Sequence, residues 1–187
     1  DVEDEARRLE KELRDILREI ADDIRKLLEE NKELLKESEK DIRRAEKAIE
    51  DILDDVRKRI TDEKKLREIE KLAEDVKRRV RELLEEDRKS VEDTTRRIKE
   101  LLREVKELVE RVIKRVRELV DEVRKDKKEK LLTEVSEEVK RLADELRELA
   151  RRVKEEVKKL LDDNRETTDR IRRTVTELLE ELKRKTK

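Results

Sequence analysis

Apolar residues recur every three or four positions along most of the chain, and this spacing constrains the fold more than any other feature. Such steps place apolar side chains on one face of an α-helix, whereas a half-buried strand needs strict alternation. The mean step is close to the about 3.6 residues of a helical turn and exceeds the about 3.5 of a coiled-coil repeat, so we expect nearly straight helices. The first stripe contains Val2, Ala6, Leu9, Leu13, Ile16, Ile20, Ile24, Leu27, Leu34, Ile42, Ala45, Ile49, Ile52, Val56 and Ile60.

Two further stripes run from Leu66 to Val123 and from Leu132 to Leu182, separated by the breaks "ITDEKKL" and "VRKDKKEKLL". Apolar residues beside each stripe widen it, as expected for helices that contact two neighbours. Short connections make consecutive helices antiparallel. We therefore predict an all-α, single-chain, antiparallel (up-down-up) three-helix bundle that forms one elongated domain. Its predicted ranges are 1–187 for the domain, about 2–60, 63–125 and 128–184 for the helices, and 61–63 and 126–128 for the loops.

The two breaks contain residues that can cap the following helix. Thr61 or Asp62 can accept hydrogen bonds from the free N–H groups of the second helix. Asp126 stands three residues before Glu129, the spacing of a capping box, with Asp in place of the usual Ser or Thr.

In each predicted helix the apolar stripe lapses and later resumes in phase. The lapses cover residues 28–42, 84–98 and 161–175, and each is close to four helical turns long. A loop would be expected to lose this phase, so we interpret the lapses as helix. The polar residues at core positions within them are Asn31, Ser38, Asp87, Ser90, Thr94, Thr95, Asn164, Thr167 and Thr168.

Folding the chain at its two breaks brings the three lapses to one level, so we predict a buried polar network there. A buried amide or hydroxyl without a partner costs about 1–3 kcal/mol, so these groups must hydrogen-bond across helices. Satisfied networks of this kind fix register. We predict two layers: Asn31, Thr94 or Thr95, and Asn164 in one, and Ser38, Asp87, Ser90 and Thr167 or Thr168 in the other.

Two other interpretations of the lapses stay open. Loops there would split the chain into six shorter helices. Alternatively, Asp87 with Asn31, Asn164 and the hydroxyls would form a pocket for a small polar ligand or a hard cation. Because calcium and magnesium sites use several carboxylate oxygens, one acidic residue is a poor basis for a cation site, and we assign no metal ligand.

The composition excludes most catalytic chemistry. The 187 residues include no Gly, Pro, Cys, His, Met or aromatic residue. The chain therefore has no imidazole, no thiolate, no usual zinc ligand, no glycine-rich phosphate loop and no stacking platform. We expect no enzymatic activity, no catalytic or cofactor-binding residue, no cofactor and no small-molecule substrate.

The charge is high but balanced, with 56 basic and 57 acidic residues and a net charge of −1. A nucleic-acid-binding protein would carry a net basic face, so we expect no nucleic-acid partner. No apolar run approaches the about 20 residues of a membrane span, so we expect no membrane partner. We expect a soluble monomer, cytoplasmic when expressed recombinantly and without a natural compartment, with a homo-oligomer as the alternative.

These features resemble those of computationally designed, parametrically generated helical bundles, here of the single-chain three-helix type with buried polar layers. The resemblance rests on the Leu/Ile/Val stripes and on segments such as "RRVKEEVKKLLDD" and "LLREVKELVERVIKRVRELV". Connections without Gly depart from common design practice. The resemblance implies a structural scaffold without natural activity, whose buried hydrogen-bond network specifies register. The alternatives are a self-assembly or interaction module that forms a larger bundle, and a polar small-ligand or cation site at the central layers.

Overall fold

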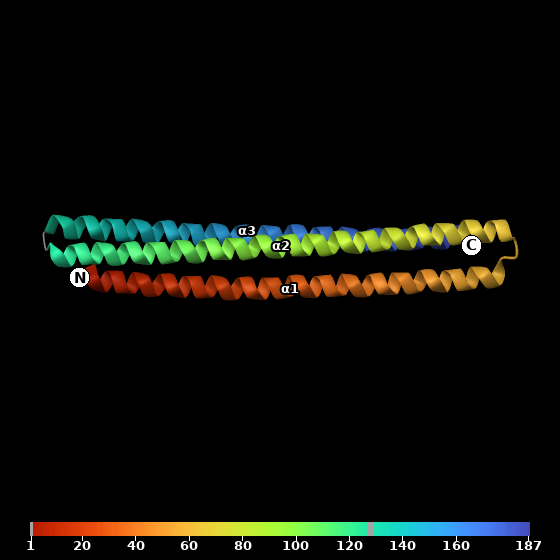
Figure 1. Ribbon diagram of the computed structural model, residues 1–187, viewed down its shortest axis with the longest axis horizontal. Coiled ribbons are helices and arrows are strands. Elements are labelled where there is room, and N and C mark those ends of the chain that lie inside the picture. Colours follow the sequence, from red (N-terminus) through yellow and green to blue (C-terminus); the bar gives the residue numbers. More distant parts are fainter. Residues whose placement is uncertain (1, 127–128) are drawn as a thin grey trace. The chain divides into compact units, whose positions relative to one another are not determined.

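The computed structural model describes residues 2–126 and 129–187, which contain three long helices (Figure 1). These are α1 (Val2–Arg59), α2 (Glu63–Lys125) and α3 (Glu129–Lys185). The described residues include no strand and no residue with a positive φ. The predicted all-α, three-helix bundle is confirmed, and each helix begins and ends within about one residue of its predicted range.

The contacts within the chain divide it into two compact units. Unit 1 comprises Asp1–Leu27 and Arg96–Leu160, and unit 2 comprises Leu28–Thr95 and Leu161–Lys187. All three helices contribute a segment to each unit. The expectation of one domain over the whole chain stays a prediction.

The three lapses in the apolar stripes are continuous helix. Residues 28–42, 84–98 and 161–175 are α-helical throughout, so the interpretation of these segments as loops is wrong. Four turns of helix return a stripe to its starting face, which explains why each one resumes in phase.

Unit 2 has a core of apolar side chains that recur every three or four residues on each helix. Ion pairs across α1 and α2 show that these helices are antiparallel, because Glu50 pairs with Lys77 whereas the later Arg57 pairs with the earlier Glu70. The core residues are Ile42, Ala45, Ile49, Leu53, Ala73, Val76, Val80, Leu83, Ile171, Val175 and Leu182.

Helix α3 runs parallel to α1 within unit 2. Arg165 pairs with Glu30 at 2.9 Å, and the later Arg172 pairs with the later Asp41 at 2.5 Å. The segments of unit 2 therefore follow the predicted up-down-up order.

Unit 1 has the same internal order. Arg117 pairs with Glu10 at 2.5 Å and Arg124 with Glu3 at 2.6 Å, as expected for antiparallel segments of α1 and α2. Its interior consists of Leu, Ile, Val and Ala residues, among them the almost fully buried Ile20.

Asp62 caps α2, and Thr61 does not. Its Oδ1 atom accepts hydrogen bonds from the backbone N–H groups of Lys64, at 3.0 Å, and Lys65, at 3.5 Å. These donors have no partner within the helix, so the carboxylate satisfies them and also interacts favourably with the helix dipole. The loop before it consists of Ile60–Asp62, close to the predicted 61–63.

The second predicted loop, 126–128, falls mainly outside the described residues. Of this loop the structure describes only Asp126, whose backbone N–H donates to the carbonyl of Glu122 at 3.0 Å. The predicted capping of α3 by Asp126 depends on residues 127 and 128 and therefore also lies outside the described residues.

Candidate functional site

Six polar residues in unit 2 form the candidate site, which we call the polar cluster: Asn31 and Ser38 of α1, Asp87 and Ser90 of α2, and Asn164 and Thr168 of α3. On each helix the two residues are three, four or seven positions apart and so share one face. Ser38, Asp87 and Thr168 are fully buried, Asn31 and Asn164 are nearly so, and Ser90 is half-buried.

A chain of two hydrogen bonds crosses all three helices of unit 2. The Ser90 hydroxyl donates to Asn164 Oδ1 at 2.8 Å, and Asn164 Nδ2 donates to Asn31 Oδ1. Because the Asn164 amide offers an acceptor to one neighbour and a donor to the other, it joins α2 and α1 through α3. This chain is the most specific tertiary contact of the cluster.

A separate hydrogen bond joins α3 to α2. The Thr168 hydroxyl donates to Asp87 Oδ1 at 2.7 Å, and both residues are fully buried. The distance lies in the usual range for a hydrogen bond from a hydroxyl to a carboxyl oxygen. The bond is a directional contact within the core.

Three buried polar atoms of the cluster have no hydrogen-bond partner. They are Asn31 Nδ2, Ser38 Oγ and Asp87 Oδ2. A buried donor or acceptor without a partner costs about 1–3 kcal/mol, and more when it is charged. The polar cluster is therefore only partly satisfied by the protein's own groups.

The hydrogen bonds follow the two layers predicted from the sequence in joining Asn31 to Asn164 and Asp87 to Thr168, and they differ from these layers at Ser90. Ser90 donates to Asn164, which donates to Asn31, and so belongs with these two residues rather than with Asp87; Thr94 and Thr95 are half-buried. Among the described residues, these two threonines form no side-chain hydrogen bond.

Thr167 lies at the edge of the cluster and is satisfied within its own helix. It is half-buried, and its hydroxyl donates to the carbonyl of Asp163 at 3.1 Å. The next residue is rotated by about 100° around the helix, and this turns Thr168 into the core.

One buried polar residue was missed by sequence reasoning. Thr186 is 5% exposed, its hydroxyl donates to the carbonyl of Lys183 at 3.0 Å, and its own carbonyl accepts from Arg59 Nη2 at 2.6 Å. Its position four residues after the core residue Leu182 was a signal that could have found it. The contact ties the residue that follows α3 to Arg59 of α1.

Charged side chains surround the polar cluster at the surface of unit 2. Arg88, next to Asp87, donates to Glu85 at 2.6 Å and to Glu39 at 3.3 Å. The hydrogen bond to Glu85, aided by Glu39, raises the pKa of Arg88 above its ordinary value. Arg88 therefore stays charged and keeps its two acidic partners at the outer edge of the α1–α2 interface.

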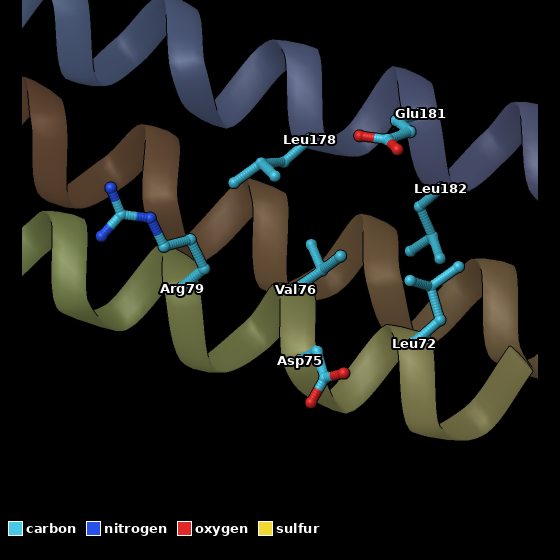
Figure 2. Close-up of a pocket in the computed structure, with 7 residues that line it drawn as sticks. All are labelled: Leu72, Asp75, Val76, Arg79, Leu178, Glu181 and Leu182. Carbon is cyan, nitrogen blue, oxygen red and sulfur yellow. The ribbon is translucent and has the colours of Figure 1, made fainter. Parts of the chain in front are cut away.

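A groove of about 200 Å³ lies between α2 and α3 in the apolar part of unit 2 (Figure 2). Leu72 and Leu182 point toward one another across it, and Val76 and Leu178 line the same space. The remaining lining residues are the charged Asp75, Arg79 and Glu181. None of the six cluster residues lines this groove, so it is a separate feature.

The described residues contain no group of three or more His, Cys, Asp or Glu side chains that could hold a metal ion. In the same part of the chain, no helix is both long enough and apolar enough to cross a membrane.

The fold and the cluster define the class of protein: an all-α bundle of three long helices with buried polar hydrogen bonds in its interior. Comparisons of the chain with protein-family models, with curated proteins and with solved structures found no match.

Proposed function

We propose that this chain is a designed structural scaffold without a natural biochemical activity, in which the polar cluster specifies the alignment of the helices. The observation that carries the proposal is the hydrogen-bond chain from Ser90 through Asn164 to Asn31, which joins three helices within one core. Such a chain forms in only one arrangement of the helices.

The physical argument concerns a shift of one helix along its neighbours. A shift of two helical turns would move α3 by about 10 Å and bring similar apolar residues into contact again. The same shift would separate Asn164 from both Ser90 and Asn31 and leave buried amide and hydroxyl groups unpaired. Each would cost about 1–3 kcal/mol, so the polar cluster penalises the shifted arrangement far more than the apolar stripes do.

The helix ends support a designed origin. The first turn of α1 contains Glu3, Asp4 and Glu5, and the last turn of each of the three helices contains two or three basic residues. This distribution complements the helix dipole at each end. Together with a surface rich in strong helix formers and the absence of Gly and Pro, it fits a sequence chosen for helix formation.

The test removes the hydrogen-bond chain without creating unpaired groups. In a variant with Asn31→Leu, Ser90→Ala and Asn164→Leu, all three partners are lost, so we expect stability to be kept or raised. Spin labels at the exposed Lys36 and Arg173 would report the alignment of α1 and α3 through their pulsed EPR distance. The parent should give one narrow distance, and the triple variant a broad or split distribution.

An Ile49→Val variant is the matched control, since it alters a buried apolar contact and should keep the narrow distance. If the triple variant also keeps one narrow distance, the hydrogen-bond chain from Ser90 to Asn31 does not set the alignment, and the role proposed for it is wrong.

The second candidate function is an interaction module that forms a larger helical bundle. The apolar floor of the groove in Figure 2, with half-buried Leu72 and Leu178, is the observation in its favour. Multi-angle light scattering separates the two candidates: a mass of one chain at all concentrations favours the scaffold, and a discrete multiple favours the module.

A further inference from the structure

Ser38 and Asp87 carry two of the unpartnered atoms of the polar cluster. Ser38 Oγ and Asp87 Oδ2 have no hydrogen-bond partner, and both residues are 0% exposed. The carboxylate needs a donor, and the hydroxyl needs both a donor and an acceptor to be fully satisfied. The two groups therefore have complementary needs.

The register of α1 and α2 places Ser38 and Asp87 at the same level of unit 2. Each directly precedes a residue of one interhelical hydrogen bond, in which Arg88 Nε donates to Glu39 Oε1 at 3.3 Å. Because the rise along a helix is only about 1.5 Å per residue, Ser38 and Asp87 lie close to the level of this bond. Thr168, which donates to Asp87 Oδ1, adds a third buried oxygen there.

The Ser38 hydroxyl does not use the acceptor that its own helix provides. Several threonines of this chain donate to the carbonyl four residues earlier, including Thr167 at 3.1 Å and Thr174 at 2.9 Å. Ser38 makes no such bond to the carbonyl of Leu34, although this arrangement is common for helical hydroxyls. Its hydrogen-bonding capacity thus remains for the interior of unit 2.

We infer that Ser38, Asp87 and Thr168 form the binding site of one buried water molecule. The water accepts a hydrogen bond from the Ser38 hydroxyl and donates one to Asp87 Oδ2. It donates its second proton to Thr168 Oγ1, whose own proton is given to Asp87 Oδ1. This matches the about three hydrogen bonds of a typical buried water, of which proteins contain roughly one per 27 residues.

The same oxygens suit a cation less well. One carboxylate and two hydroxyls fall short of the about six to eight oxygen ligands around calcium. A cation also has no lone pair to accept the Ser38 proton. The inference goes beyond the proposed function, because the water satisfies these atoms whether or not the cluster sets the helix alignment.

The test is magnetic relaxation dispersion of the water oxygen nucleus, which detects water molecules held for longer than the tumbling time of the protein. Replacing Ser38→Val removes the hydroxyl and fills its space with methyl groups. We expect the dispersion amplitude to fall by the equivalent of about one water per chain relative to the parent. The control Ser136→Ala, which removes a hydroxyl that donates to Glu5 at 3.0 Å at the surface, should leave the amplitude unchanged.

A second variant guards against misfolding of the first. The combination Ser38→Val, Asp87→Leu and Thr168→Val removes every polar group of the site, so it should fold and should also lack this water. Equal amplitudes in the parent and both variants would overturn the inference. It would likewise be overturned if the parent's amplitude or unfolding temperature changed between sodium, potassium and choline chloride of equal ionic strength, since this would indicate a bound cation. Neither result would alter the spin-label distances that test the proposed function.

Discussion

Two sections of unit 2 are equally buried but are held together by different forces. The apolar section, from Ile42 to Leu53 with its partners on α2 and α3, includes Ile49, Ala73 and Val80, each 0% exposed. The polar cluster contains Ser38, Asp87 and Thr168, which are also 0% exposed. Exposure alone therefore does not distinguish the two sections.

The difference lies in how each section responds to a displaced neighbour. Dispersion and hydrophobic contacts are non-directional, so an apolar side chain that moves finds other apolar atoms. A hydrogen bond such as that from Thr168 to Asp87 depends on direction and distance, and its loss leaves a buried carboxyl oxygen without a donor. The apolar section should contribute more stability, and the polar cluster more specificity.

The largest expected effect tests the apolar section. Ile49→Ala should lower the free energy of unfolding by about 2–5 kcal/mol, because it removes buried methylene and methyl groups and leaves a cavity. Chemical denaturation followed by circular dichroism measures the change. Ile49→Val, which removes one methyl-sized group, should lower it by only about 0.5–1.5 kcal/mol. If Ile49→Ala lowered the free energy of unfolding by less than Thr168→Val does, the apolar section would not contribute more stability than the polar cluster.

A substitution in the polar cluster should lower the free energy of unfolding by less than Ile49→Ala does. Thr168→Val keeps the side-chain shape but removes the donor to Asp87, so it should lower the free energy of unfolding by about 1.5–3 kcal/mol. The same denaturation experiment measures it. Thr167→Val is the matched control on the adjacent residue, and it should change stability by no more than about 0.5 kcal/mol.

Adding Asp87→Leu to Thr168→Val should recover most of this loss, since both partners are then apolar. If the effects of the two single substitutions simply add, the groups are not coupled.

A directional hydrogen bond at an exposed helix end should contribute less. Asp62→Ala removes the acceptor for the N–H groups of Lys64 and Lys65 and should lower the free energy of unfolding by about 1 kcal/mol. Thr61→Ala, one residue earlier, should have almost no effect. Equal effects of the two substitutions would show that Asp62 does not act as the cap.

The smallest effect is expected for a surface contact of unit 1. The hydrogen bond from Arg117, supported by Arg14, lowers the pKa of Glu10 below its ordinary value. The contribution of Glu10 to stability is therefore present above the pKa of the unfolded chain and is lost as the pH falls through the lower, folded pKa. Carboxyl-carbon NMR titration should show the Glu10 pKa rising toward its ordinary value in Arg117→Gln.

Glu3 provides the internal control for that titration. Its pKa is lowered chiefly by a hydrogen bond from Arg124, so Arg117→Gln should leave it unchanged. A shift of both glutamates would mean that Arg117 acts through a general change in unit 1 and not through its contact with Glu10.

The helices were predictable because apolar residues recur every three or four positions along most of the sequence, and the stripes resume in phase after each lapse. The phase of Ile42 relative to Leu28 was enough to predict helix between them, and the structure agrees. The cap on α2 was predictable only as one of two neighbours, because Thr61 and Asp62 both accept hydrogen bonds. Backbone geometry decides between them.

The partners within the polar cluster were less predictable. Thr167 and Thr168 differ by about 100° around α3, and only the packing of α1 and α2 determines which one faces inward. Ser90 bonds to Asn164 and not to the residues of its predicted layer, Ser38 and Asp87, because short side chains form hydrogen bonds only at close range. A sequence-level register, uncertain by one or two residues, cannot resolve this.

The contact between Arg59 and the carbonyl of Thr186 has a consequence for fusing this chain to other proteins. Chain ends usually fray, and a fused domain then inherits a flexible joint. Here Thr186 is buried and its carbonyl is held by Arg59 of α1, so a partner joined after Lys187 would start from an anchored point. A short helical linker would then fix the orientation of the attached domain relative to α1. Deleting Thr186 and Lys187 would remove the contact with Arg59 and leave the joint flexible.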